Sequence, residues 1–332
     1  MKYFRFTIIS LVVLSGIASF FIWIGIYLPI DSNSKEEMVF SIKRGEGLND
    51  ISLNLEKEGI LRRGCLFRLY VILTGKQSKL KAGNYILLKS MSIDEIADKF
   101  VLGDFIKNKV TIVEGWSLKD IADYLEEKGI IKKDDFIASA GSNNDLISKY
   151  SFLSDKPEGL SLEGYLFPDT YEIFEGETAS EIIRDMLDNF NRKLTTEIKE
   201  EIKNQQKSIF DIVTMASMIE KEVITIEDKK VVSGILWKRL KTGMPLQVDA
   251  TISYITDKKT TAISLSDLNI DSFYNTYKYK GLPIGPISNP GIESILAAVY
   301  PTESEYWYYL STPEGETIFN KTLKEHELDR TK

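Results

Sequence analysis

The sequence predicts an α+β fold built from an N-terminal transmembrane helix, a small α+β subdomain and a larger mixed α/β domain. Three observations support this class: a long uncharged run at residues 6–30, a strand–turn–helix pattern that occurs twice at an offset of 70 residues, and alternating helical and strand-like patterns through the rest of the chain. With 332 residues, of which 43% are hydrophobic, the chain is long enough for two domains with their own cores.

The first predicted element is a transmembrane helix at residues 6–30. These 25 residues carry no charge, and at about 1.5 Å per residue they span roughly 37 Å, more than a hydrocarbon core of about 30 Å. Lys2 and Arg5 precede the run and mainly acidic residues follow it, so the positive-inside tendency places residues 1–5 in the cytoplasm and most of the chain outside. A cleaved signal peptide is the alternative, but its apolar region is usually only about 7–15 residues long. We therefore expect a retained single-pass anchor.

Composition limits the chemistry of any site. The chain has a single histidine, His326, and a single cysteine, Cys65, so catalysis by Ser-His-Asp or Cys-His groups has at most one base, and a zinc site with several such ligands is excluded. We expect neither a metal nor another cofactor. The net charge of −7 offers no basic surface to a phosphate backbone, which argues against nucleic acid as a partner.

After a polar linker at 31–37, two similar segments occur at 40–60 and 110–130. Each pattern indicates a strand, a glycine turn and an amphipathic helix that ends at a glycine, Gly59 or Gly129. A partial third copy lies between them. Repeated units of this kind resemble LysM-type modules, which bind N-acetylglucosamine chains. The alternative is that they only pack together, because strand–helix units recur widely without binding sugar.

A helix is expected at 208–223, with two acidic residues near its end. Its apolar stripe, at helical spacing, consists of Ile209, Ile212, Val213, Ala216, Ile219 and Val223. Glu220 falls inside this stripe, and Glu222 lies on its flank. A carboxyl held against an apolar wall loses hydration, which raises its pKa and suits it to donate a proton at neutral pH. The alternative is an ordinary solvated edge of the helix.

The segment 162–171 combines aromatic, acidic, glycine and proline residues, and Pro168 prevents a regular helix. We therefore expect a shaped loop. The aromatic residues that would stack on sugar faces are Tyr165, Phe167 and Tyr171. Glu163 and Asp169 would accept hydrogen bonds from sugar hydroxyls; alternatively, they only cap backbone amides.

A further helix is expected at about 228–242, where Gly243 and a following proline stop it. Residues 246–254 then alternate in the manner of a strand. Such a strand would place Gln247 and Asp249 on one face, where they would line a polar groove beside the acidic helix.

Asn275 and Tyr277 precede a segment at 281–291 that holds three prolines and three glycines in eleven residues. This composition predicts a rigid, irregular loop that suits backbone groups held near a ligand. The alternative is a structural crossover between elements. Residues 305–319 have the pattern of a closing hairpin.

Taken together, these segments resemble the membrane-anchored endolytic murein transglycosylases of the YceG-like family. The motifs that carry the resemblance are Val113-Glu-Gly-Trp, Leu162-Glu-Gly-Tyr-Leu-Phe-Pro-Asp-Thr-Tyr, Met215-Ala-Ser-Met-Ile-Glu-Lys-Glu, Leu246-Gln-Val-Asp, Tyr274-Asn-Thr-Tyr and Gly281-Leu-Pro-Ile-Gly-Pro-Ile-Ser-Asn-Pro-Gly. They stand in the family's order and cover the chain from about residue 40 to the C-terminus. One small departure is Val223, where the family motif often ends in threonine.

The resemblance implies an enzyme of the bacterial inner membrane that cuts nascent glycan strands of peptidoglycan and leaves a 1,6-anhydro-N-acetylmuramic acid end. Its implied parts are a cytoplasmic tail at 1–5, the membrane helix at 6–30, a linker at 31–37, a LysM-like subdomain at 38–107 and a catalytic domain at 108–332. The expected partners are the glycan strands, the membrane, and cell-wall synthases such as penicillin-binding proteins.

The resemblance also implies that Glu222 is the essential acid, and its flank position keeps it within reach of a substrate. Glu220 would then support it. The candidates to position the sugars are Glu163, Tyr165, Asp169, Gln247, Asp249, Asn275 and Tyr277. Two other functions stay open: a non-catalytic peptidoglycan-binding scaffold that recruits synthases, and a glycan hydrolase with Asp249 as the second carboxylate.

Overall fold

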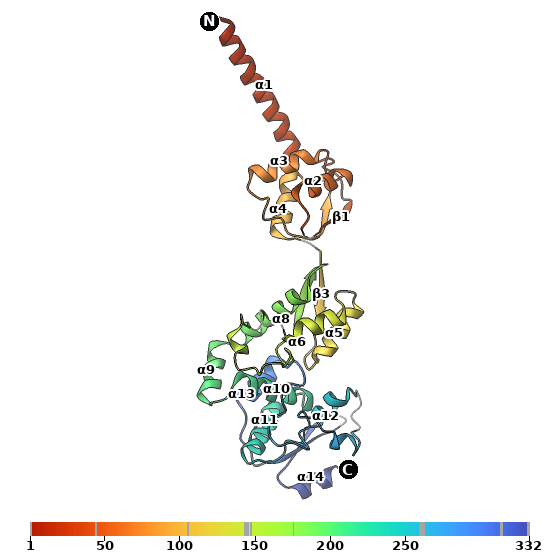
Figure 1. The fold of residues 1–332 in the computed structure, drawn as a ribbon, viewed down its shortest axis with the longest axis vertical. Coiled ribbons are helices and arrows are strands. Elements are labelled where there is room, and N and C mark those ends of the chain that lie inside the picture. Colours follow the sequence, from red (N-terminus) through yellow and green to blue (C-terminus); the bar gives the residue numbers. More distant parts are fainter. Residues whose placement is uncertain are drawn as a thin grey trace. The chain divides into compact units, whose positions relative to one another are not determined.

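The computed structural model describes residues 2–43, 45–104, 106–142, 146, 148–174, 176–258, 263–312 and 315–330. The chain divides into two compact units (Figure 1). The first comprises Met1–Lys109 and Glu172–Glu177, and the second comprises Val110–Tyr171 and Thr178–Lys332. Helices and short two-stranded sheets form both units, in agreement with the predicted α+β class.

The chain opens with helix α1 (Lys2–Tyr27). Among the residues that the structure describes, no helix is both long enough and apolar enough to cross a membrane. The transmembrane helix expected at 6–30 is therefore not confirmed, and within that range the side chains of residues 6–10 and 12 lie outside the described part. The C-terminal end of α1 packs within the first unit, where Ile26 joins the hydrophobic core.

The first unit is built around one antiparallel strand pair. β1 (Glu37–Ile42) pairs with β2 (Gly83–Leu88) so that Phe40 lies opposite Tyr85. The helices of this unit after α1 are α2 (Leu48–Lys57), α3 (Gly64–Leu73) and α4 (Ile93–Leu102). The rings of Phe40 and Tyr85 contact Phe100 of α4 at centroid distances of 5.8 and 4.6 Å. These aromatic contacts form the centre of the core.

Both predicted strand–turn–helix units are present. In the second, β3 (Lys107–Thr111) leads into α5 (Leu118–Glu127), and β3 pairs with β4 (Thr170–Phe174). Gly59 and Gly129 follow α2 and α5 with φ values of +71° and +69°. These left-handed values favour glycine, which explains why each helix ends there.

The second unit holds much of its core in helices. Its elements include α6 (Lys133–Ser142), η1 (Ser151–Leu153), α8 (Ala179–Lys193), α9 (Thr196–Asn204), α10 (Ile209–Glu222), α11 (Ile226–Lys241), α12 (Asp249–Thr256), η2 (Asp267–Asn269), α13 (Ile292–Val299) and α14 (Leu323–Asp329). Helices α10, α11 and α13 pack on one another (Figure 1). The hydroxyl of Ser208 caps α10 by accepting the N–H of Asp211 at 2.9 Å. All residues from Ile212 to Ile219 are buried, so the predicted acidic-ended helix is confirmed.

The strand predicted at 246–254 is wrong, because most of this segment forms α12, which begins at Asp249. Gln247 has a left-handed φ of +53°, so it does not continue a strand face toward Asp249. The buried residues Val248 and Ile252 are four apart, a spacing that fits one face of a helix. The short apolar pattern therefore suited both kinds of element, and packing selected the helix.

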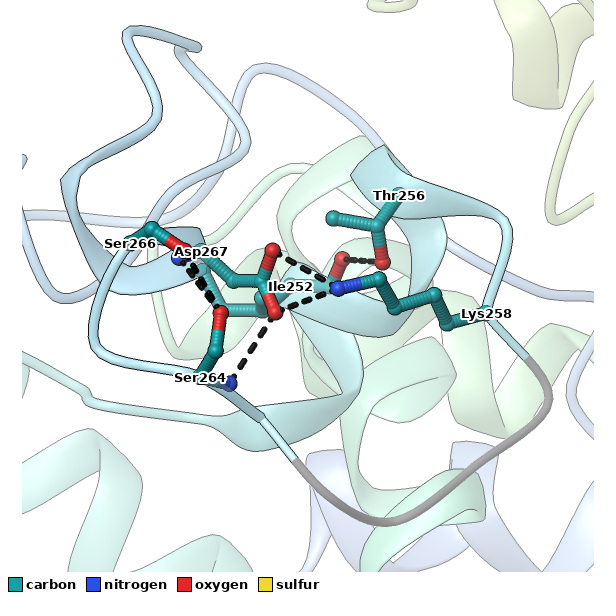
Figure 2. Close-up of polar contacts among 6 residues, drawn as sticks. All are labelled: Ile252, Thr256, Lys258, Ser264, Ser266 and Asp267. Atoms are coloured by element: carbon teal, nitrogen blue, oxygen red, sulfur yellow. Dashed lines mark hydrogen bonds and ion pairs between the residues drawn. The ribbon is translucent and has the colours of Figure 1, made fainter.

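Asp267 ties η2 to the end of α12 (Figure 2). Its carboxylate accepts two bonds from the ammonium of Lys258, at 2.9 and 2.7 Å, and one from the N–H of Ser264 at 3.0 Å. The hydroxyl of Ser264 in turn accepts the N–H of Asp267 at 3.2 Å. These bonds favour the charged carboxylate, and chiefly the bond from Lys258 lowers the pKa of Asp267 to about 2.

The C-terminal hairpin predicted at 305–319 is confirmed. Strands β5 (Tyr308–Ser311) and β6 (Thr317–Asn320) pair antiparallel. Just before β5, the carbonyl of Trp307 accepts bonds from Nε and Nη2 of Arg239, at 2.9 and 2.7 Å. Because Arg239 lies in α11, these bonds attach the hairpin to the helical core.

Candidate active site

Glu222 is the last residue of α10, and it is partly exposed. Two side chains of β5 hold it: the hydroxyl of Tyr309 donates to its Oε2 at 2.9 Å, and the hydroxyl of Ser311 donates to its backbone carbonyl at 2.9 Å. Desolvation by the surrounding protein raises the pKa of Glu222 to about 7. At neutral pH such a carboxyl exists in both protonation states, as a general acid requires.

The chain places further charged and polar groups around this carboxyl. Besides desolvation, the charge of Asp249 raises the pKa of Glu222, whereas the bond from Tyr309 and the charge of Arg239 lower it. Asp249 is exposed at the start of α12 and accepts a bond from the hydroxyl of Tyr277. Three residues singled out from the sequence, Glu222, Asp249 and Tyr277, are thus brought together.

Glu220 lies two residues earlier, and its side chain is only 7% exposed. Its Oε1 pairs with the buried ammonium of Lys229 at 3.1 Å, and its Oε2 accepts the N–H of Gly291 at 2.9 Å. Because Gly291 caps α13, Glu220 links α10 to both α11 and α13. Its charge also contributes, after desolvation, to a raised pKa of Glu114. The carboxyl of Glu220 is therefore used for packing between helices.

Glu163 is buried, and its carboxyl binds groups of the protein itself. It accepts the N–H of Leu118 at 2.9 and 3.0 Å and the side-chain amide of Asn289 at 3.0 Å. Burial outweighs these bonds and raises the pKa of Glu163 to about 8. Of the two roles expected from the sequence, the structure thus shows the capping of a backbone amide.

Asn289 joins segments that are distant in the sequence. Its Oδ1 accepts the N–H groups of Gly164 and Leu166, both at 2.9 Å. Its backbone carbonyl accepts the N–H of Gly115 at 2.9 Å, and its N–H donates to the carbonyl of Trp116 at 2.8 Å. The segment 281–291 that contains Asn289 has neither helix nor strand before α13, as predicted. Its irregular backbone therefore supports a polar junction in the interior.

Three predicted sugar contacts also have their polar or aromatic groups engaged within the protein. Tyr165 is fully buried among aromatic core residues. Asp169 is exposed, but its carboxylate accepts the amide of Asn189 at 2.9 Å, which is the main reason that its pKa is lowered. Asn275 is fully buried, and its amide donates to two backbone carbonyls around η2, at 3.0 and 2.9 Å.

Sequence reasoning placed Gln247 at the site and missed Tyr309 and Arg239. Gln247 is exposed, and its N–H donates to the carbonyl of Thr276 at 3.2 Å. The only sequence signal for Tyr309 was its place in the aromatic run of the predicted hairpin, and Arg239 had none because it resembles any basic residue near a helix end. Within the described ranges, no group of three or more potential metal ligands occurs.

The fold and this geometry define the class of protein: an α+β chain whose candidate site is a carboxyl at the end of a buried helix. The sequence model of the YceG-like family matches residues 40–332, which is most of the chain. The chain therefore belongs to the YceG-like family.

Similar proteins from three bacteria support this assignment. A protein of Bacillus subtilis (strain 168) named endolytic murein transglycosylase is 34% identical over 314 residues, which cover 92% of this chain and 87% of the relative. A protein of the same name from Streptococcus pneumoniae serotype 2 (strain D39) is 32% identical over 326 residues, which cover 90% of this chain and 59% of the relative. The crystal structure of a YceG-like protein from Listeria monocytogenes has a TM-score of 0.60 and 34% identity, covering 90% of this chain and 100% of its own.

Proposed function

We propose that this chain is a murein lytic transglycosylase that cuts within glycan strands, between N-acetylmuramic acid and N-acetylglucosamine. The names of its relatives support the substrate and the reaction. The observation that carries the site assignment is Glu222, a partly exposed residue at the end of α10 whose pKa is raised to about 7 by desolvation of its carboxyl. Glu220 is the weaker candidate for the acid, because its carboxyl is already paired with Lys229 in the interior. Loss of one partner of such a pair typically costs about 3–5 kcal/mol of stability, so we assign Glu220 a structural role.

In the proposed reaction, protonated Glu222 gives its proton to the glycosidic oxygen while the bond from that oxygen to the muramyl C1 breaks through an oxocarbenium-like state. The carboxylate then removes the proton of the muramyl C6 hydroxyl, whose oxygen bonds to C1. This step closes the 1,6-anhydro ring and restores the protonated acid. No water is consumed. Asp249, Gln247 and Tyr277 are the proposed contacts to the sugars.

Asp249 also favours one alternative, because a second carboxylate near the acid could activate water for hydrolysis. The two reactions leave different ends. The full-length chain in detergent should be incubated with purified uncrosslinked glycan strands, and the products analysed by mass spectrometry. We expect anhydro ends. Reducing ends, heavier by one water, would reject the transglycosylase reaction in favour of hydrolysis, and binding without cleavage at any pH would support a scaffold.

We propose further that the uncharged run at 6–30 anchors the chain in the cytoplasmic membrane, with residues 1–5 inside and the remainder outside. The part that crosses the membrane would end before Ile26, which packs in the core of the first unit. The uncharged run supports this proposal. The assignment of 38–107 as a LysM-like subdomain and 108–332 as the catalytic domain rests on the repeated strand–turn–helix pattern and the family motifs. Cell-wall synthases stay a predicted partner.

A further inference from the structure

One strand of the C-terminal hairpin holds both the side chain and the main chain of Glu222. Tyr309 and Ser311 are two residues apart on β5, so their side chains project from the same face of the strand. The Tyr309 hydroxyl donates to Oε2 of the carboxyl, and the Ser311 hydroxyl donates to the backbone carbonyl, each at 2.9 Å. The end of α10 is therefore fixed at two points by one element.

The hairpin is itself attached to α11 through both strands. On the β5 side, the guanidinium of Arg239, which is 5% exposed, donates twice to the carbonyl of Trp307. On the β6 side, the hydroxyl of Thr317 donates to Oδ2 of Asp228 at 3.1 Å. Because α11 also packs against α10, Tyr309 is held on the same framework as the carboxyl that it contacts.

The bond from Tyr309 has a defined chemical effect on a group that must act as acid and then as base. A hydroxyl that donates to a carboxyl favours the charged form, so the bond strengthens as the proton leaves. Burial, together with the charge of Glu222, raises the pKa of Tyr309 well above its usual range, so the phenol keeps its own proton. Desolvation and the charge of Asp249 have the opposite effect, because they raise the pKa of Glu222 and so favour its protonated form.

The other groups that face the carboxyl come from three further elements. The N–H of Ala250 on α12 and the charge of Arg239 on α11 also favour the charged form of Glu222. The phenol of Tyr277, in the loop after η2, lies close enough to sense the charge of Glu222, although its bond goes to Asp249. Among the described residues, Tyr309 is the one whose side-chain hydroxyl bonds the carboxyl directly.

We propose that Tyr309 is a positioning residue for the acid. Its bond to Oε2 fixes the plane of the carboxyl so that Oε1 presents the proton to the glycosidic oxygen, and it stabilises the carboxylate once the proton has left. This inference rests on the proposed function of Glu222.

The test is the pH dependence of kcat/KM for cleavage of glycan strands by the full-length Tyr309→Phe variant. Loss of the donor should reduce kcat roughly ten- to a hundredfold with little change in KM. It should also move the high-pH limb of the profile upward by about one pH unit, because the charged form of Glu222 loses a bond. Tyr308→Phe, on the opposite face of β5, is the matched control and should leave kcat and the profile unchanged.

An isosteric replacement covers the case in which Tyr309→Phe does not fold. Incorporation of 3-fluorotyrosine at position 309 keeps the ring and makes the phenol a stronger donor, so the same limb should move to lower pH. Unchanged kcat and unchanged limbs in these variants would overturn the role of Tyr309. Glu222→Gln separates this failure from failure of the proposed function. Full activity of Glu222→Gln would reject Glu222 as the acid. If Glu222→Gln is inactive and Tyr309→Phe has wild-type activity, only the positioning role of Tyr309 is rejected.

Discussion

Glu220 and Glu222 are two residues apart, yet the structure gives their carboxyls different surroundings. Glu220 pairs with the ammonium of Lys229 and accepts the N–H of Gly291, whereas Glu222 accepts the hydroxyl of Tyr309. The helical pattern placed Glu220 in the apolar stripe and Glu222 on its flank, yet both residues are partly buried in the structure, and they differ instead in their polar partners. The pattern did not reveal that a buried lysine keeps Glu220 paired.

At the same scale, the raised pKa of Glu163 leads us to expect a specific effect of pH on stability. Its pKa is about 8 in the folded chain, above the ordinary value of about 4.5, so its contribution to stability is complete below about pH 4.5 and is lost as pH rises through 8. Glu163→Gln stays neutral and should remove this loss. We expect its stability relative to wild type to improve by on the order of 1–3 kcal/mol between pH 5 and pH 8.5.

Urea unfolding at a series of pH values measures this effect. Glu158→Gln, which replaces an exposed glutamate of the neighbouring loop, is the matched control. Its curve of unfolding free energy against pH should be parallel to that of wild type. If the curves of Glu163→Gln and wild type are also parallel, the buried carboxyl of Glu163 does not titrate near pH 8.

At the scale of elements, part of the secondary structure of both units could be predicted from the sequence. The helices at 209–222 and 226–241 and the C-terminal hairpin follow from caps, periodicity and turn residues, which are local signals. The strand prediction for 246–254 was wrong because a short apolar pattern fits both a strand and a helix.

The candidate site was less predictable, because its geometry depends on contacts between distant segments. Polar residues in conspicuous motifs were expected to meet sugar, yet Glu163 and Asn275 bind the backbone, and Asn289 joins three segments. Tyr309 contacts Glu222 although the two residues are 87 positions apart in the sequence, and no local sequence pattern predicts this contact. Composition did identify carboxyls as the groups available for chemistry.

At the scale of the whole molecule, the proposed anchor would keep the chain attached to the membrane. Cell fractionation measures this directly. We expect the full-length chain in the membrane fraction, released by detergent but not by high salt, because an inserted helix is held by the hydrophobic effect. A variant that lacks residues 1–22, and so keeps Ile26 in the core of the first unit, should appear in the soluble fraction. Release of the full-length chain by salt alone would contradict the anchor.

The central claim is that Glu222 supplies the proton that breaks the glycosidic bond. The most direct measurement is the rate of glycan-strand cleavage by Glu222→Gln, compared with wild type and with Glu227→Gln, an exposed control in the first turn of α11. We predict a loss of about 10²–10⁴-fold for Glu222→Gln with its thermal unfolding midpoint retained, and an unchanged rate for Glu227→Gln. A folded Glu222→Gln variant that cleaves at the wild-type rate would contradict the claim.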